Sequence, residues 1–144
     1  MKLSTRGRYS VRIMLDLAMH DDAGPVFLKD IALRQQISHK YLWQVIHPLK
    51  TMGLITSTRG ANGGYRLARP ASRITLKDII QVGEGSLSLV DCVDNSGGCD
   101  RSDLCVYRDV WREATLKMLD TFESLTLKDM VERQKAKIAG IREQ

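Results

Sequence analysis

A β-hairpin is predicted where two short alternating segments flank an Asn-Gly-Gly turn, directly after three helical segments. The two strands are expected at residues 54–58 (Leu-Ile-Thr-Ser-Thr) and 65–69 (Tyr-Arg-Leu-Ala-Arg). Asn-Gly turns favour hairpins because their central residues readily adopt positive φ. Three helices followed by a hairpin is the element order of a winged helix-turn-helix domain. The chain is therefore predicted to be mainly α-helical, with the hairpin as a two-stranded wing.

Apolar spacing and capping residues predict the first two helices. The first begins after Ser4 or Thr5 and ends near the Asp-Asp-Ala-Gly-Pro segment at residues 21–25. The second covers residues 28–36. These two helices form the first part of a helix-turn-helix unit.

The third helix has the clearest start signal in the chain. Ile37 and Leu42 flank the capping residue Ser38 at the spacing of a hydrophobic staple, and Gly53 fits the C-terminal cap. Pro48 lies inside this helix and predicts either a kink or an early stop followed by one more turn. The expected buried stripe is Leu42, Val45, Ile46, Leu49 and Met52.

Positive charge is concentrated in the first half of the chain. Residues 1–70 contain 11 Lys/Arg and 4 Asp/Glu, whereas residues 71–144 contain 11 and 13. A basic half indicates a polyanion partner, with a solvated basic surface as the alternative. Together with the winged-helix order, this charge favours double-stranded DNA. The predicted DNA-binding residues are Ser38, His39, Lys40, Tyr41, Gln44, Arg59, Gly60, Gly63 and Gly64.

Side-chain chemistry assigns these residues different roles. The Ser and Tyr hydroxyls suit phosphates, Lys40 suits a phosphate or a guanine edge, and Gln44 can pair with adenine. Arg59 at the wing is placed to enter a minor groove, and the neighbouring glycines let the backbone approach DNA closely. Trp43 has two interpretations at this stage. It either packs on sugar or a thymine methyl group, or turns inward as part of the core.

All three cysteines lie in one polar segment with the spacing C-x6-C-x5-C. They are Cys92, Cys99 and Cys105, in what the composition predicts to be a flexible loop. Buried packing is the usual role of a free cysteine, so three in a polar loop indicate chemistry. The possibilities are an iron–sulfur cluster, a zinc site and a thiol redox switch. The tight C-x2-4-C pairs that structural zinc prefers are absent.

A long amphipathic helix is predicted after the cysteines. Its apolar residues recur every three or four positions, which favours packing against the same helix of a second subunit. Thr75 and Thr126 are expected to cap the helices before and after this region. The residues of the predicted dimer seam are Leu104, Tyr107, Trp111, Ala114, Met118, Phe122 and Leu125.

These features divide the chain into three parts. Residues 1–82 are predicted to form the winged helix-turn-helix domain, 83–105 the cysteine segment, and 106–144 the dimerisation helix and a C-terminal helix. No apolar run approaches the roughly 20 residues of a membrane span, and the start lacks the pattern of a signal peptide. A cytoplasmic location is expected. An enzyme is not expected, because His20, His39 and His47 do not pair with a nucleophile by spacing and no Gly-Lys phosphate motif occurs.

The chain resembles the bacterial iron–sulfur cluster regulators of the IscR, NsrR and RirA type. The resemblance runs essentially end to end and rests on residues 1–10, Ile37-Ser38 with Tyr41-Leu42, the wing motif at 59–67, and the cysteine segment. It implies a homodimeric winged-helix transcription regulator with an iron–sulfur cluster controlling its binding to operator DNA. The signal would be cluster or iron status, redox state or nitric oxide.

The same resemblance places the three cysteines as cluster ligands and leaves the fourth ligand open. The IscR branch has a histidine three residues after the last cysteine, where this chain has Arg108. A guanidinium is always protonated and is no ordinary iron ligand. A [2Fe-2S] cluster is favoured and a [4Fe-4S] cluster is possible. The remaining candidates for the fourth ligand are Asp94, Asp100, Asp103, Tyr107, solvent and a small-molecule thiol.

Overall fold

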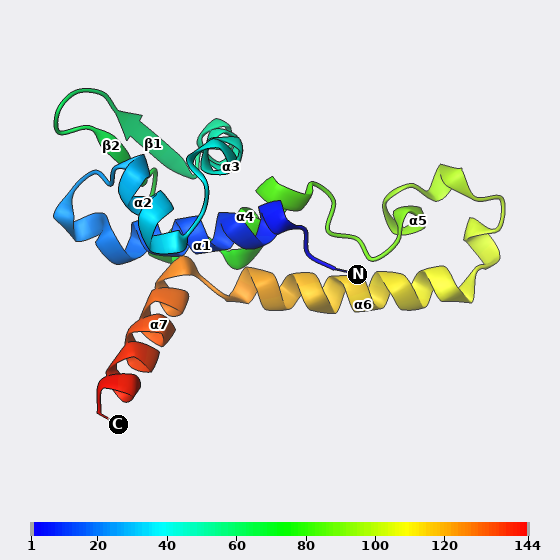
Figure 1. Ribbon diagram of the computed structural model, residues 1–144. Coiled ribbons are helices and arrows are strands. Elements are labelled where there is room, and N and C mark those ends of the chain that lie inside the picture. The colour runs from blue at the N-terminus through cyan, green and yellow to red at the C-terminus, as the bar shows by residue number, and fades with distance from the viewer. Residues whose placement is uncertain (1, 144) are drawn as a thin grey trace.

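The computed structural model describes residues 2–143 and contains the expected three helices and wing, followed by four further helices (Figure 1). The mainly α-helical prediction with a two-stranded wing is confirmed. Short 3-10 turns occupy residues 21–23, 71–73, 96–98 and 102–104. The elements are α1 (Thr5–His20), α2 (Leu28–Gln35), α3 (His39–Thr51), β1 (Ile55–Thr58), β2 (Gly64–Leu67), α4 (Leu76–Glu84), α5 (Asp91–Asp94), α6 (Val106–Ser124) and α7 (Leu127–Arg142).

The core lies between α1, α2, α3 and α4. The predicted hydrophobic staple is present, because Ile37 and Leu42 are both buried beside the Ser38 cap. The Ser38 hydroxyl accepts a hydrogen bond of 3.2 Å from the Tyr41 N–H, which fixes the start of α3. The fully buried side chains include Ile13, Met14, Leu17, Ile31, Leu42, Val45, Ile46, Leu49, Ile79 and Leu127.

Helix α3 continues through its proline. It reaches Thr51 with Pro48 inside it, so the predicted early stop is wrong. The helix ends one turn later, where Met52 is the cap and Gly53 has a φ of 72°. The N–H groups of Gly53 and Leu54 donate back to carbonyls of the last turn over 3.0 Å each, and the buried Leu54 holds this turn against the core. This closing motif satisfies the carbonyls of Leu49 and Lys50 and ends the helix one turn after the proline.

The hairpin has the expected antiparallel pairing. Ile55 pairs with Leu67 and Thr58 with Gly64, so the strands are each within one or two residues of the predicted bounds. A further bridge joins Val26 to Tyr65 and attaches the wing to the segment before α2. The wing is thereby fixed to the helical core at its base.

Helices α1 and α4 cross at unusually close range. A Cβ atom on Gly83 would lie only 2.6 Å from the Cα atom of Gly7, so this crossing requires glycine. The backbone N–H and hydroxyl of Ser4 both donate to Oε1 of Glu84, over 2.8 and 2.6 Å. A shift of α4 would therefore be transmitted directly to the start of α1.

The starts of α4 and α7 lie side by side and share the tetrapeptide Thr-Leu-Lys-Asp. Thr75 with Asp78, and Thr126 with Asp129, form capping boxes, which confirms both predicted caps. The two threonines are joined by an antiparallel bridge, flanked by reciprocal backbone hydrogen bonds of 2.8 Å. The end of α6 is thus attached to the base of the core, and α7 leaves the body in another direction (Figure 1).

Helix α6 extends away from the core as a long rod (Figure 1). Towards its C-terminal end, Ala114, Met118 and Phe122 are half-buried, in the region where α6 contacts α4. Around its N-terminal end, Tyr107 is 71% exposed and Trp111 is 43% exposed. The predicted seam is therefore partly used within the chain and partly open. No helix within residues 2–143 is long and apolar enough to cross a membrane.

Candidate DNA interface and cysteine segment

The N-terminal half of α3 presents the predicted DNA-binding side chains. Ser38, His39, Lys40 and Gln44 are exposed, and Tyr41 is half-buried. The Tyr41 ring packs edge-on against Tyr9 of α1, with ring centroids 5.5 Å apart. Tyr41 therefore offers its hydroxyl from a ring that is held by the core.

A groove of about 490 Å³ separates α3 from the wing. Among the predicted residues, His39, Arg59 and Gly64 line it. Trp43 also lines it and is 52% exposed, so its interpretation as a core residue is wrong. His47 and Lys50 lie in the same groove although they were left out of the predicted set. The sequence spacing could have indicated them, because Trp43, His47 and Lys50 recur every three or four residues and therefore lie on one face of α3.

The three wing glycines occupy different environments. Gly60 is exposed with a φ of 104° and has nothing near the position of a Cβ atom. Gly63 is buried, and a Cβ atom there would lie 2.3 Å from the carbonyl oxygen of Thr58. Gly64 has a φ of 137° and packs against the backbone of Val26. The fold itself thus requires glycine at 63 and 64, and only Gly60 offers an open backbone surface at this tip.

The cysteine segment contains short helical elements, where the composition predicted only a loop. Cys92 lies in the short helix α5, Cys99 follows a 3-10 turn, and Cys105 caps the N-terminus of α6. All three are free thiols; Cys99 is exposed and the other two are half-buried. Within residues 2–143, no three His, Cys, Asp or Glu side chains are close enough together to hold a metal ion.

Arg108 takes a backbone role in this segment. Its Nε donates a 2.8 Å hydrogen bond to the carbonyl oxygen of Cys92. The bond joins α5 to the first turns of α6. A second attachment follows on α6, where the buried Thr115 hydroxyl accepts from the Leu89 N–H over 3.3 Å. The stretch leading to the first cysteine is therefore fixed along α6.

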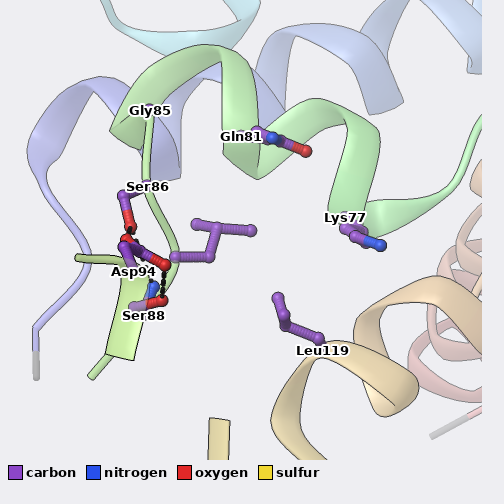
Figure 2. Close-up of a pocket in the computed structure, with 8 residues that line it drawn as sticks. Lys77, Gln81, Gly85, Ser86, Ser88, Asp94 and Leu119 are labelled. Carbon is purple, nitrogen blue, oxygen red and sulfur yellow. Dashed lines mark hydrogen bonds between the residues drawn. The ribbon is translucent and has the colours of Figure 1, made fainter. Parts of the chain in front are cut away.

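Asp94, one candidate for the fourth ligand, is engaged by two serines. The hydroxyls of Ser86 and Ser88 both donate to its carboxylate, and these hydrogen bonds, that of Ser86 first, lower the pKa of Asp94. Figure 2 shows this trio at one end of a cavity of about 390 Å³, with Lys77 of α4 at the other end. Lys77 pairs with Glu123 of α6 over 2.9 Å. The cavity lies where α4, α6 and the segment before the first cysteine meet.

Comparison with known proteins assigns the chain to a family. Residues 3–133 match Rrf2, an iron-dependent transcriptional regulator. Protein rrf2 of Nitratidesulfovibrio vulgaris (strain Hildenborough) is 44% identical over 131 residues, which cover 91% of this chain and 87% of that protein. The chain belongs to the Rrf2 family.

Solved structures of the Rrf2 fold agree with this assignment. T. potens IscR is 41% identical with a TM-score of 0.76, covering 93% of this chain and 88% of that one. Staphylococcus aureus CymR in its oxidized form is 36% identical with a TM-score of 0.74, covering 92% and 97%. As an Rrf2-family member, the chain is a DNA-binding transcription regulator and not an enzyme.

Proposed function

We propose that this chain is a cytoplasmic, homodimeric regulator whose operator binding is controlled by an iron–sulfur cluster held by Cys92, Cys99 and Cys105. Helix α3 would enter the major groove, and Arg59 of the wing would reach the minor groove. The exposed part of α6 would form the dimer interface. The proposal thus assigns DNA binding, cluster binding and dimerisation to different elements of one chain.

The DNA interface is supported by the exposed polar face of α3 and the groove beside it. Two half-sites would be bound by the two copies of α3 in a dimer, which predicts an operator with two-fold symmetry. Lys40 and Arg59 supply charge for the backbone, whereas Gln44 supplies a bidentate group for adenine. Trp43 adds an apolar surface beside the thymine methyl position.

The single observation that carries the cluster assignment is the placement of three free thiols between α4 and α6. The donor set fits the group, because thiolates are the usual ligands of iron–sulfur clusters. Within the described residues the three cysteines do not form a ready ligand group, so they would have to come closer together before all three could bind. A bound cluster would supply a charged centre that is sensitive to oxidants, nitric oxide and iron supply.

The chain's own contacts indicate how the segment would affect DNA binding. Arg108 fixes Cys92 to α6, and Lys77 ties α6 to α4. Helix α4 in turn crosses α1 at Gly7, and α1 packs on α3. A change in the shape of the cysteine segment would shift α4 and thereby the orientation of α3. The regulator would act as a switch rather than a catalyst.

The test is anaerobic purification of the wild type and of a variant with all three cysteines changed to alanine. We expect a coloured wild type whose native mass includes a cluster, and a colourless variant that remains folded with reduced operator selectivity. Ser102→Ala, in the same segment, is the matched control and should keep the colour. Equal operator affinity and selectivity in the triple variant and the loaded wild type would contradict the proposal.

A thiol switch is the second candidate, and two observations favour it. Among the described residues the three thiols do not form a ready metal site, and one similar structure is CymR in an oxidized form. Zinc is the other metal that thiolates would accept. A colourless anaerobic preparation would favour these alternatives. Zinc content would then separate the metal site from the switch, and peroxide-dependent disulfide formation measured by mass would identify the switch.

A further inference from the structure

Arg12 of α1 closes the end of α2. Its Nε donates to Oε1 of Gln35 over 3.3 Å, and its Nη2 donates to the backbone carbonyl oxygen of the same residue. Gln35 is the last residue of α2, and Gln36 after it adopts a left-handed φ of 53°. Carbonyls in the last turn of a helix have no partner within the helix. Arg12 therefore caps α2 at the point where the chain turns towards α3.

A buried carboxylate holds the other side of the Gln35 side chain. Asp16 is 3% exposed and accepts a 2.8 Å hydrogen bond from Nε2 of Gln35. It also forms a two-pronged pair with Arg34, whose Nη2 lies 2.6 Å from Oδ1. The Gln35 amide is thus fixed between an acid at one end and Arg12 at the other.

Arg12 also reaches the first turn of α3 through two aromatic rings. Its guanidinium carbon lies 5.0 Å from the centroid of the Tyr9 ring. The Tyr9 ring meets Tyr41 edge-on at an interplanar angle of 82°. Tyr41 is one turn into α3, where its N–H bonds the Ser38 cap. One arginine therefore touches the end of α2 directly and the start of α3 through Tyr9.

We propose that Arg12 is a positioning residue that sets the orientation of α3 relative to α1, and so determines how selectively the regulator recognises its operator. The inference rests on the proposed role of α3 in reading DNA. Arg12 is exposed, but its guanidinium is bound to Gln35 and lies over the Tyr9 ring, so we assign it an effect on DNA through α3 rather than a phosphate contact. The guanidinium offers its two N–H groups to the two oxygens of Gln35 in a fixed planar fork, which a lysine ammonium on a flexible stem does not reproduce.

The test compares Arg12→Lys and Arg12→Gln with the wild type and with Lys137→Gln, a charge-matched control on α7. The probes are a duplex selected from random-sequence DNA by the wild-type protein, and a scrambled duplex of the same length. Affinities are measured over a series of salt concentrations, and the unfolding midpoint of each protein is measured without DNA. Arg12→Lys keeps the charge, so it removes the fork with the least disturbance to folding.

For Arg12→Lys we expect an affinity loss of about tenfold on the selected duplex, in line with the loss of a hydrogen bond to a charged group. Affinity for the scrambled duplex and the salt dependence should stay as in the wild type. Combining Arg12→Lys with Gln35→Ala should cost less than the sum of the two single changes, because both remove the bond between Nε of Arg12 and Oε1 of Gln35.

Three outcomes would overturn the proposal. For Arg12→Gln, which removes the charge, equal losses on both duplexes with a salt slope reduced by about 0.9 would make Arg12 a phosphate contact. Losses on both duplexes that follow the unfolded fraction would make its role only structural. Unchanged selectivity in the Arg12 variants would show that Arg12 does not affect operator recognition. The assignment of α3 is tested separately by Gln44→Ala, which removes a base contact without touching Arg12.

Discussion

The guanidinium of Arg108 donates to the carbonyl oxygen of Cys92 over 2.8 Å, and so fixes the first cysteine to the helix that begins after the last one. The position matters because a residue three places after the last cysteine is a ligand in the family branch that this chain resembles. In this chain that position is Arg108, which bonds the backbone of the cysteine segment instead. In the proposed cluster site the fourth position would then be filled by another group, and Cys99 is the most exposed of the three thiols.

Replacing Arg108 with alanine should make the Cys92 thiol react faster with an alkylating reagent, because α5 loses its attachment to α6. The expected increase is about fivefold, corresponding to roughly 1 kcal/mol for one hydrogen bond. Mass spectrometry of timed reactions measures the rate at each cysteine. Arg112→Ala, on the next turn of α6, is the control and should leave the rate unchanged. Equal rates in the two variants would show that the bond does not restrain Cys92.

Changing Trp111 to aspartate should convert the proposed dimer into a monomer, because it places a charge in the exposed apolar part of α6. Trp111 is 43% exposed in the single chain, and Tyr107 beside it is 71% exposed. Sedimentation velocity measures the change in mass. Asp120→Lys is the control, because nine residues place it on the opposite face of the helix. A dimeric Trp111→Asp protein would move the interface elsewhere.

The winged-helix part of the fold could be predicted because its signals are local. The Ser38 cap and the Ile37–Leu42 staple act within a few residues, and the structure contains both. The predicted hairpin also forms, but the positive φ angles of its turn lie at Gly60 and Gly64 rather than at the Asn-Gly pair. The early stop predicted from Pro48 is wrong, because α3 continues to Thr51. The closing hydrogen bonds after Thr51 come from the next segment, which a rule about proline within helices does not include.

Longer-range contacts were beyond the sequence patterns. The capping of α2 by Arg12 and the bond from Arg108 to Cys92 join residues 23 and 16 positions apart. No sequence pattern marks Arg12, and the sequence shows Arg108 only as the residue that stands where the IscR branch has a histidine. Side-chain direction, which depends on how the helices pack, decides their roles. The roles of two wing glycines also depend on packing, because contacts within the fold require glycine at positions 63 and 64.

The proposed DNA contacts should separate into two kinds when they are removed singly. Lys40→Ala should weaken binding to all duplexes and reduce the salt slope by about 0.9, as expected for one phosphate contact. Gln44→Ala should cost about 1–3 kcal/mol on the operator alone and relax the preference at one base pair. Fluorescence anisotropy with the selected and scrambled duplexes measures both effects. Lys128→Ala, on α7, is the control; a loss of the same size there would make the effect one of net charge.

The capping box of α7 should make part of the chain's stability depend on pH. Hydrogen bonds from the Thr126 hydroxyl and backbone N–H lower the pKa of Asp129, so folding favours its ionised form. The contribution is present above the pKa of an unfolded aspartate, about 3.9, and is lost as the pH falls through the lower folded-state value. Asp129→Asn should therefore lower the thermal midpoint at neutral pH and approach the wild type in acid. Asp120→Asn, which removes the same charge from α6, is the control. A constant difference between Asp129→Asn and the wild type at all pH values would mean that the ionised carboxylate is not what stabilises the start of α7.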